Sequence, residues 1–401
     1  MLSRGKLAAV IAGLSVAFLL AEIGVRLVQP IQPQQLLPLP YRAGDLRTLV
    51  STPQYVGPDA DLGWRLTSGR VGGAGGMFRT NLAGLRADRE YTIDPAPGVR
   101  RLVALGDSFT QCDEIELEDC WTSGLEQAWP GTEVLNFGVP GYGPDQVWLR
   151  YQRDGRQYRP CAVLIGYMVE NVNRVVNRFR PFYTPQTSLV LSKPRFILEG
   201  DGLRLLPNPA ATLEQLEDPR WTESAFGPDD HWYFPGMFVA NPLDVSHVVR
   251  VARTAAYNRH VRDRGIGSNP NVTSDAKALG AAYRPDREAY QITGRLLVQF
   301  ARQARQDGAT PVVIVFGRKA EVVGLRDGEA KAYAPLLDWL EREGVPTVDV
   351  TDRLAREALR IDVNSLFGGG GHYNEAGNAI VTATLSRLLP ELVGGTCDTW
   401  R

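Results

Sequence analysis

Five short runs of buried-type residues alternate with helical patterns along this chain, and this alternation restricts its fold most strongly. The strand-like runs cover residues 101–105, 133–137, 162–167, 310–316 and 345–350. The helical patterns cover residues 119–128, 144–158, 286–306, 332–343 and 374–388. Strands that alternate with helices form a parallel sheet with helices on both faces. We therefore predict an α/β fold with a parallel, doubly wound (flavodoxin-like) sheet of about five strands.

The predicted domain is preceded by a proline-rich segment and interrupted by a large insertion. Residues 30–62 are rich in proline and predict a semi-rigid tether. The domain itself is expected over residues 63–400, with a large insertion at 174–285 after the third strand. The insertion begins with a pattern typical of a hairpin that turns at residues 200–202, and a helical stretch follows near residues 242–264. An insertion beside the strand ends usually shapes access to a site.

The chain begins with a segment typical of export or membrane insertion. Residues 7–28 are apolar or small apart from the charged residues Glu22 and Arg26. As a helix this segment is about 33 Å long, enough to cross the roughly 30 Å hydrocarbon core of a bilayer. Glu22 and Arg26 lie four residues apart, so they would share a face of the helix and pair with each other.

Two interpretations of this segment both place the chain outside the cytoplasm. We predict an uncleaved transmembrane anchor within residues 1–29. A cleaved signal peptide with its apolar region at 7–20 is the alternative, although Leu19 is unsuited to the cleavage site. Arg4 and Lys6 precede the apolar stretch, and basic residues mark the cytoplasmic side of a span. The remaining chain is therefore expected to face the periplasm or the cell exterior.

Composition excludes several classes of protein. Apolar residues make up 44% of the chain, enough to build a large core. The 44 basic residues balance the 45 acidic ones and form no polybasic block, so we expect no nucleic-acid partner. The four histidines and four cysteines lie at none of the spacings that a zinc site needs, so we expect no metal.

The four cysteines are compatible with an exported protein. Cys112 and Cys120 bracket a short acidic segment and could close a small loop, which would leave Cys161 and Cys397 as the other pair. Four cysteines allow three pairings, however, and a reduced core thiol is equally consistent with the start of a buried strand at Cys161. The pairing therefore stays open.

Residues suited to acyl transfer follow the first three predicted strands, at the sheet edge where ligands bind in such folds. Ser108 comes directly after the first strand on a turn that begins with glycine. A serine hydroxyl is a weak nucleophile without a base, and His372, between a glycine-rich turn and a helix, is our candidate. Gly141 and Asn171, after the second and third strands, would supply donors to an oxyanion.

This pattern resembles the SGNH (GDSL-type) family of serine hydrolases. Residues 106–110 read GDSFT, as in the first block of that family, and the segment PGYG is similar to its second block. The resemblance covers residues 100–175 and 308–390 and leaves the insertion out. It implies that Ser108 is the nucleophile, that His372 is the base, and that no cofactor is needed. It also implies an oxyanion hole, made by Ser108, Gly141 and Asn171.

Two positions depart from the family pattern. The third block usually reads Gly-x-Asn-Asp, whereas Val172 follows Asn171 here. The last block has an aspartate three residues before its histidine, and that position is Gly369. The acid that would orient His372 is therefore unknown, and a backbone carbonyl is an equal alternative. Three acids lie near His372 in the chain: Asp349, Asp352 and Asp362.

The resemblance and the export signal together predict a membrane-anchored extracytoplasmic esterase. It would cleave carboxylic esters through an acyl-enzyme, with O-acylated small molecules or cell-surface carbohydrate as candidate substrates. An acyltransferase that uses the same site is one alternative. A non-catalytic envelope protein that binds glycan or a partner through a degenerate site is another, because of Gly369. Arg174, Arg178 and Arg180 could meet an anionic substrate, but nearby acidic residues offer them ordinary ion-pair partners.

Overall fold

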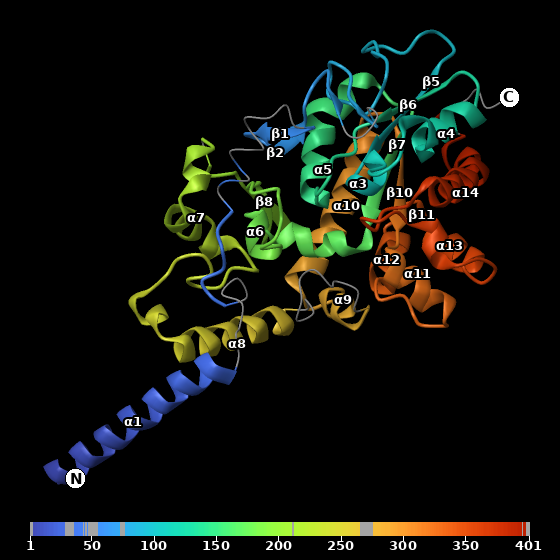
Figure 1. The fold of residues 1–401 in the computed structure, drawn as a ribbon. Coiled ribbons are helices and arrows are strands. Elements are labelled where there is room, and N and C mark those ends of the chain that lie inside the picture. The colour runs from blue at the N-terminus through green and yellow to red at the C-terminus, as the bar shows by residue number, and fades with distance from the viewer. Residues whose placement is uncertain are drawn as a thin grey trace.

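The centre of the fold is a five-stranded parallel sheet (Figure 1). The computed structural model describes residues 3–28, 36–42, 44, 46, 55–72, 77–210, 212–264, 276–394 and 396–397. The sheet strands are β5 (Arg100–Leu105), β6 (Thr132–Asn136), β7 (Ala162–Met168), β10 (Thr310–Phe316) and β11 (Thr347–Asp349). They lie in the order β11-β10-β7-β5-β6, and every neighbouring pair is parallel.

This strand order confirms the predicted fold class. Counted along the chain within the sheet, the order is 2-1-3-4-5, which is that of a flavodoxin-like fold. Its topological switch point lies between β5 and β7, which pair directly. Ligands in such sheets bind outside the carboxyl ends of the strands at this point. The residues that follow β5 and β7 are therefore where a site is expected.

Helices cover both faces of the sheet, because successive strand residues point to opposite sides. Val103 and Leu105 of β5 belong to the core on one face, and Leu102 and Ala104 to the core on the other. The helices on the first face are α5 (Pro144–Arg150), α10 (Glu288–Gln306) and α12 (Ala334–Arg342). Those on the second are α4 (Trp121–Ala128), α11 (Lys319–Arg326), α13 (Thr351–Glu357) and α14 (Glu375–Val393).

Short turns of helix connect these elements. The helix expected over 144–158 ends as α5 at Arg150 and continues as η4 (Tyr151–Gly155) and η5 (Arg156–Tyr158). The remaining short pieces of the domain are α3 (Ser108–Gln111), η3 (Leu117–Asp119), η6 (Val169–Val176) and η10 (Val363–Leu366).

The insertion after β7 folds onto the domain core. Its hairpin, β8 (Arg195–Glu199) paired with β9 (Gly202–Leu206), turns where the sequence predicts. Phe182, Phe226 and Trp232 of the insertion are buried in the same core as α10. Its helical pieces are α6 (Arg180–Tyr183), η7 (Glu214–Glu217), α7 (Pro219–Phe226), η8 (Gly227–Asp229), η9 (Pro242–Val245), α8 (His247–Asp263) and α9 (Ala276–Ala282).

The described part of the expected tether is packed. Leu36 and Leu37 are buried, the Leu39 N–H donates to the Met237 carbonyl oxygen at 2.7 Å, and the Tyr41 hydroxyl donates to the Leu216 carbonyl oxygen. The apolar side chains of this segment pack on the insertion instead of standing in solvent. Prolines 30, 33 and 53, on which the expectation also depends, lie outside the described residues.

Two small antiparallel pairs follow this segment. They are β1 (Val56–Asp59) with β2 (Gly63–Leu66), and β3 (Val71–Gly72) with β4 (Phe78–Arg79). Trp64 of β2 is buried in the main core.

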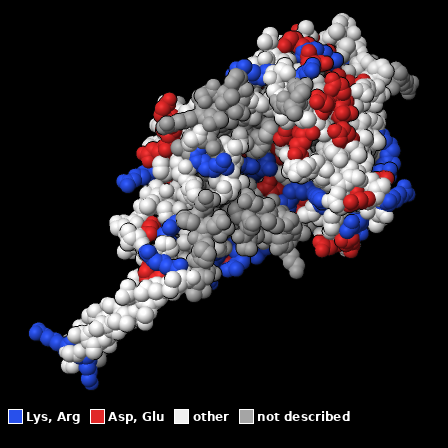
Figure 2. Space-filling view, viewed as in Figure 1, with Lys and Arg blue, Asp and Glu red and all other residues white. Residues whose placement is uncertain are grey.

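The N-terminal helix α1 (Arg4–Val28) projects from the domain (Figure 1). Its most apolar window has a mean hydropathy of 2.2 and is not buried, so by length and composition the helix is able to cross a membrane. In Figure 2 its projecting part is white, without charged groups, between the basic residues at its N-terminal tip and the charged residues where it meets the domain. The predicted pair is present: Arg26 Nε donates to Glu22 Oε1 at 2.8 Å.

Glu22 also joins α1 to the insertion. Its carboxylate accepts hydrogen bonds from Ser246 Oγ at 2.8 Å, from the His247 N–H at 2.9 Å and from the Val248 N–H at 3.1 Å. These donors lie at the beginning of α8, where backbone N–H groups have no partner within the helix. The carboxylate therefore caps α8 from another element.

Two disulfides are present, Cys112–Cys120 and Cys161–Cys397. The first closes a short loop after α3. The second joins the residue before β7 to the segment after α14, across a sequence separation of 236 residues. It therefore fastens the last helix to the central sheet.

Breaking the long-range disulfide should destabilise the domain. The Cys161→Ser/Cys397→Ser double variant is expected to lose about 2–5 kcal/mol of unfolding free energy, because the unfolded chain is no longer cross-linked. Urea unfolding of the full-length protein in detergent, followed by tryptophan fluorescence, measures this change. An unfolding midpoint equal to that of the wild type would contradict it.

Candidate active site

Ser108 lies at the carboxyl end of β5, at the topological switch point. It is the first residue of α3, and Asp107 caps this short helix by accepting the Phe109 N–H at 3.0 Å. The turn requires glycine at position 106, because a Cβ there would lie 2.0 Å from Thr110 Oγ1. The chain therefore turns sharply after the strand and holds the serine at the edge of the sheet.

The structure brings Ser108 and His372 together. Ser108 Oγ and His372 Nε2 are 2.8 Å apart. The histidine lies in the loop before α14, which Asn374 caps by accepting the Gly377 N–H at 3.1 Å. Its ring packs against Phe109, with 5.3 Å between ring centroids. A hydroxyl and an imidazole at this distance satisfy the geometry for proton transfer.

Glu114 lies against the other ring nitrogen of His372. We did not predict Glu114 from the sequence. Its Oε2 lies 3.2 Å from His372 Nδ1, on the side of the ring opposite Ser108. The same carboxylate accepts the Gly370 N–H at 2.5 Å and the His372 N–H at 3.2 Å. Ser108, His372 and Glu114 are thus hydrogen-bonded in series, in the arrangement of a catalytic triad.

The electrostatics of the pair follow from this contact. The hydrogen bond to His372 holds the pKa of the Glu114 carboxyl below its usual value. Burial of the imidazole acts to lower its pKa, but the Glu114 hydrogen bond and the charges of Asp113, Glu114 and Asp107 outweigh that effect. The pKa of His372 is therefore raised. The site stabilises an imidazolium, which is the form that appears when the serine loses its proton.

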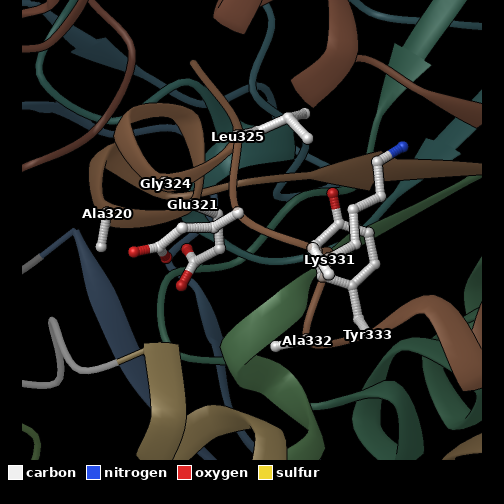
Figure 3. A pocket seen from close by; sticks show the side chains of 9 residues that line it. Ala320, Glu321, Gly324, Leu325, Lys331, Ala332 and Tyr333 are labelled. Carbon is white, nitrogen blue, oxygen red and sulfur yellow. The ribbon is translucent and has the colours of Figure 1, made fainter. Parts of the chain in front are cut away.

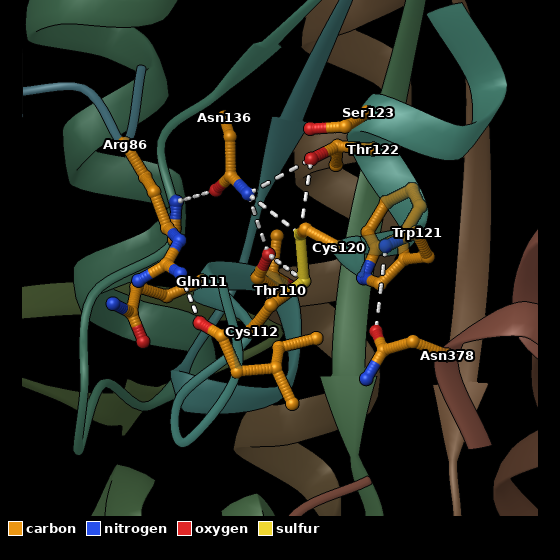
Figure 4. The surroundings of a disulfide bond; sticks show 12 residues. Arg86, Thr110, Gln111, Cys112, Cys120, Trp121, Thr122, Ser123, Asn136 and Asn378 are labelled. Atoms are coloured by element: carbon orange, nitrogen blue, oxygen red, sulfur yellow. Dashed lines mark hydrogen bonds between the residues drawn. A yellow bond between two sulfur atoms is a disulfide. The ribbon is translucent and has the colours of Figure 1, made fainter. Parts of the chain in front are cut away.

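The loop that carries Glu114 is held in an unusual backbone conformation. Cys112 and Glu114 both have positive φ, 63° and 74°. The Cys112–Cys120 disulfide closes the loop (Figure 4). Arg86 Nη2 donates to the Ile115 carbonyl oxygen at 2.6 Å. Non-glycine residues with positive φ persist where their surroundings fix them, and they are frequent at functional sites.

The sequence did contain a signal for this residue. Glu114 lies in the acidic segment between Cys112 and Cys120, just after the GDSFT block. The three acids near His372 in the chain are engaged elsewhere. Lys331 donates to both Asp349 and Asp352, and Asp362 accepts from the Asn364 N–H.

Asn171 is hydrogen-bonded to the residue before the serine. Its Nδ2 donates to Asp107 Oδ2 at 3.1 Å, and its buried Oδ1 has no partner among the described residues. Arg174 Nη1 donates to the same Asp107 oxygen at 3.2 Å. One N–H of the Asn171 amide therefore connects the loop after β7 to the residue before Ser108.

Gly141 lies in the loop after β6, on the other side of β5. The Val139 N–H of this loop donates to the Gly106 carbonyl oxygen at 3.0 Å, which ties the loop to the serine turn. Gly141 has a φ of +80°, which favours glycine. Nearby, Asn136 caps the end of its strand, since its Oδ1 accepts the Gly138 N–H at 2.9 Å.

A small cavity of the described residues lies apart from this site, and no candidate cluster of metal ligands occurs among those residues. No group of three or more His, Cys, Asp or Glu side chains within the described ranges is arranged to hold a metal ion. A small cavity of about 20 Å³ near α11 is lined by Glu321, Gly324 and Tyr333, among others (Figure 3), and it includes none of the residues placed in the site above.

Comparisons with known proteins show similarity at a low level. No protein-family model matches the sequence, and no curated protein matches it. A member of the lipolytic G-D-S-L family from Veillonella parvula DSM 2008 is 9% identical with a TM-score of 0.36, covering 73% of this chain and 100% of its own. This is the family that the sequence resembles.

Two further solved structures are similar to the same degree. LAE5, an alpha/beta hydrolase enzyme from the metagenome of Lake Arreo, Spain, has 12% identity and a TM-score of 0.38, with 74% of this chain and 95% of that chain covered. Axe2, an acetylxylan esterase from Geobacillus stearothermophilus, has 12% identity and a TM-score of 0.35, with 74% and 94% covered.

Removing the Glu114 charge should lower the pKa of His372. In Glu114→Gln the neutral amide no longer favours the imidazolium, whereas burial still opposes it. NMR titration of the imidazole resonances should therefore show His372 losing its proton at lower pH than in the wild type. Glu116→Gln, an exposed change in the same disulfide loop, is the control and should leave the titration unchanged. An unaltered His372 titration in Glu114→Gln would contradict the assigned pairing.

Proposed function

We propose that this protein is a serine esterase that hydrolyses carboxylic esters through a covalent acyl-enzyme. The observation that carries the proposal is the series of hydrogen bonds from Ser108 Oγ through His372 to Glu114. A hydroxyl, an imidazole and a carboxylate in this order are the parts that nucleophilic acyl transfer requires.

The mechanism follows from the contacts of His372. Ser108 Oγ attacks the ester carbonyl carbon while His372 Nε2 takes the hydroxyl proton, and Glu114 stabilises the imidazolium. The tetrahedral intermediate collapses as His372 returns the proton to the leaving alcohol. Water then attacks the acyl-serine and gives a proton to His372. His372 passes this proton to Ser108 Oγ as the second tetrahedral intermediate collapses, which releases the acid and restores free Ser108 and a neutral imidazole.

The developing oxyanion needs donors on the opposite side of the carbonyl carbon. We assign this role to the N–H groups of Ser108 and Gly141 and to the Asn171 amide. Each follows the carboxyl end of one of three adjacent strands. The Asn171 amide has a second N–H besides the one that donates to Asp107, and this second proton is the one available to substrate.

The observed acid also bears on the alternative of a degenerate site. Glycine at position 369 removes the aspartate that is usual there, but the Glu114 carboxylate contacts the His372 ring in its place. An intact constellation favours catalysis over binding alone. An esterase passes the acyl group to water, whereas an acyltransferase passes it to a sugar hydroxyl. Product analysis in the presence of a polysaccharide separates these two activities.

We further propose that α1 is retained as a membrane anchor and that the site faces the periplasm or the cell exterior. The Glu22 carboxylate accepts three hydrogen bonds from the start of α8, so the end of α1 is part of the folded domain. The two disulfides suit an oxidising compartment. An anchored site outside the cytoplasm would meet O-acylated carbohydrate of the cell surface, which is the proposed substrate class.

Ser108→Ala should abolish covalent labelling by a fluorophosphonate probe and lower the hydrolysis of p-nitrophenyl acetate at least about 10³-fold, because the nucleophile is lost. Gel fluorescence and a spectrophotometric assay measure the two effects. Ser224→Ala, an exposed change on α7, is the control and should behave like the wild type. Absence of labelling of the folded wild-type protein would contradict the proposed activity.

The mature protein should keep its N-terminal helix. After expression in a host that exports it, the protein is expected to stay in the membrane pellet through alkaline carbonate washing and to dissolve only in detergent. Its intact mass should include residues 1–28. A mass that lacks this segment would show that a signal peptidase removes it.

A further inference from the structure

Three arginines follow Asn171, and their partners differ. Arg174 is bound to carboxylates, with Nη2 3.0 Å from Glu170 Oε2 and Nη1 3.2 Å from Asp107 Oδ2. Arg178 Nη1 lies 3.0 Å from Asp229 Oδ2. Arg180 has no carboxylate partner among the described residues. Within the described residues its guanidinium makes one weak hydrogen bond, from Nη1 to the Gly141 carbonyl oxygen at 3.4 Å. Its buried Nε has no hydrogen-bond partner among these residues.

Arg180 lies directly beside a residue of the proposed oxyanion hole. A Cβ built on Gly141 would lie 3.9 Å from Arg180 Cζ, and the side chains of Leu189 and Trp64 close the same space. The Arg180 N–H donates to the Leu191 carbonyl oxygen at 3.0 Å, so the backbone that carries the guanidinium is fixed. The insertion thus extends a cation toward the place where an ester would be held.

A guanidinium in this environment is unusual. Burial lowers the pKa of Arg180 to about 9, and the charge of Arg174 acts in the same direction. Glu170 and Asp107 oppose this shift, but their hydrogen bonds go to Arg174. The Tyr183 ring supplies one apolar side of the guanidinium, with 5.6 Å from Cζ to the ring centroid. An anion with two oxygens would satisfy the donors that the protein leaves without a partner.

We propose that Arg180 binds a carboxylate or phosphate group of the substrate, so that the esters cleaved here are acyl esters of acidic carbohydrates. This inference rests on the proposed esterase activity at Ser108 and names the class of its substrate. The anion would lie beside Gly141 while the ester carbonyl is at Ser108. A uronic acid and a sugar phosphate both offer the required pair of oxygens.

The first test compares substrates by their kcat/KM. The wild type should prefer an O-acetylated methyl glucuronide, or an O-acetylated glucoside 6-phosphate, over the O-acetylated methyl glucoside. In Arg180→Gln this preference should fall about 10- to 100-fold, as expected for the loss of a charge-assisted hydrogen bond. Arg180→Lys keeps the charge without the planar fork and should recover part of it. The larger of the two preferences shows whether the substrate group bound by Arg180 is a carboxylate or a phosphate.

Arg220→Gln is the matched control. It removes one positive charge from an exposed position of the same insertion and should leave the preference unchanged. Thermal unfolding of each variant separates a specific effect from loss of the fold. Equal kcat/KM for charged and neutral glycosides in the wild type, or an Arg180→Gln variant with unchanged preference, would overturn the proposal.

Binding without hydrolysis separates this inference from the proposed activity. Titration calorimetry with an unacetylated glucuronate tetrasaccharide and with glucose 6-phosphate should show binding of at least one to the wild type, and at least about tenfold weaker binding to Arg180→Gln. Such binding in a protein that cleaves no ester would uphold the anion site and reject the esterase. Ester cleavage without Arg180-dependent binding or preference would do the reverse.

Discussion

The hydrogen bonds of one carboxylate, that of Glu114, hold the two halves of the site together. The loop after β5 carries Ser108 and Glu114, and the loop before α14 carries His372. The Glu114 carboxylate accepts two backbone N–H groups of the second loop as well as the imidazole, so it fixes the loop and the ring at once. The left-handed conformation at Glu114 costs free energy, about 1 kcal/mol or more, and the disulfide and Arg86 hold the loop in place. The serine–histidine contact depends on this support.

Most of the fold could be predicted from local patterns because the sheet is buried on both faces. Each strand is a continuous apolar run, and the predicted strands match the observed ones to within about two residues, as is usual for boundaries. The helices α11 and α13 were missed for a physical reason. They have eight and seven residues, about two turns each, so a helical period repeats only about twice in their sequence. The helix α4 is as short, but its prediction came from a longer pattern at residues 119–128. Packing against the sheet and α14 stabilises them instead.

The site was predictable only in part, because its contacts cross the chain. Ser108 and His372 follow from short blocks with strong local signatures, whereas an orienting acid is defined only by where it lies in space. The three acids near His372 in the sequence lie within about two dozen positions of it, whereas Glu114 is 258 positions away. Similarly, nothing in the sequence shows that Asp107 takes one N–H of Asn171, or that Arg174 and not Arg180 binds the two buried carboxylates. Such pairings are decided by the packing of three loops on neighbouring strands.

The insertion connects the N-terminal helix α1 to the site around Ser108. At one end, the beginning of α8 binds Glu22 and so receives the last turns of the apolar helix. At the other end, α6 places Arg180 beside Gly141. Between them, Phe182, Phe226 and Trp232 are buried in one core with α10, which itself packs on the sheet. Because interiors of this kind are close-packed and deform little, the direction of α1 and the position of Ser108 are coupled through a single block of structure. With α1 held in a membrane, as we propose, this block would set both the distance of Ser108 from the bilayer and the side from which a substrate reaches it.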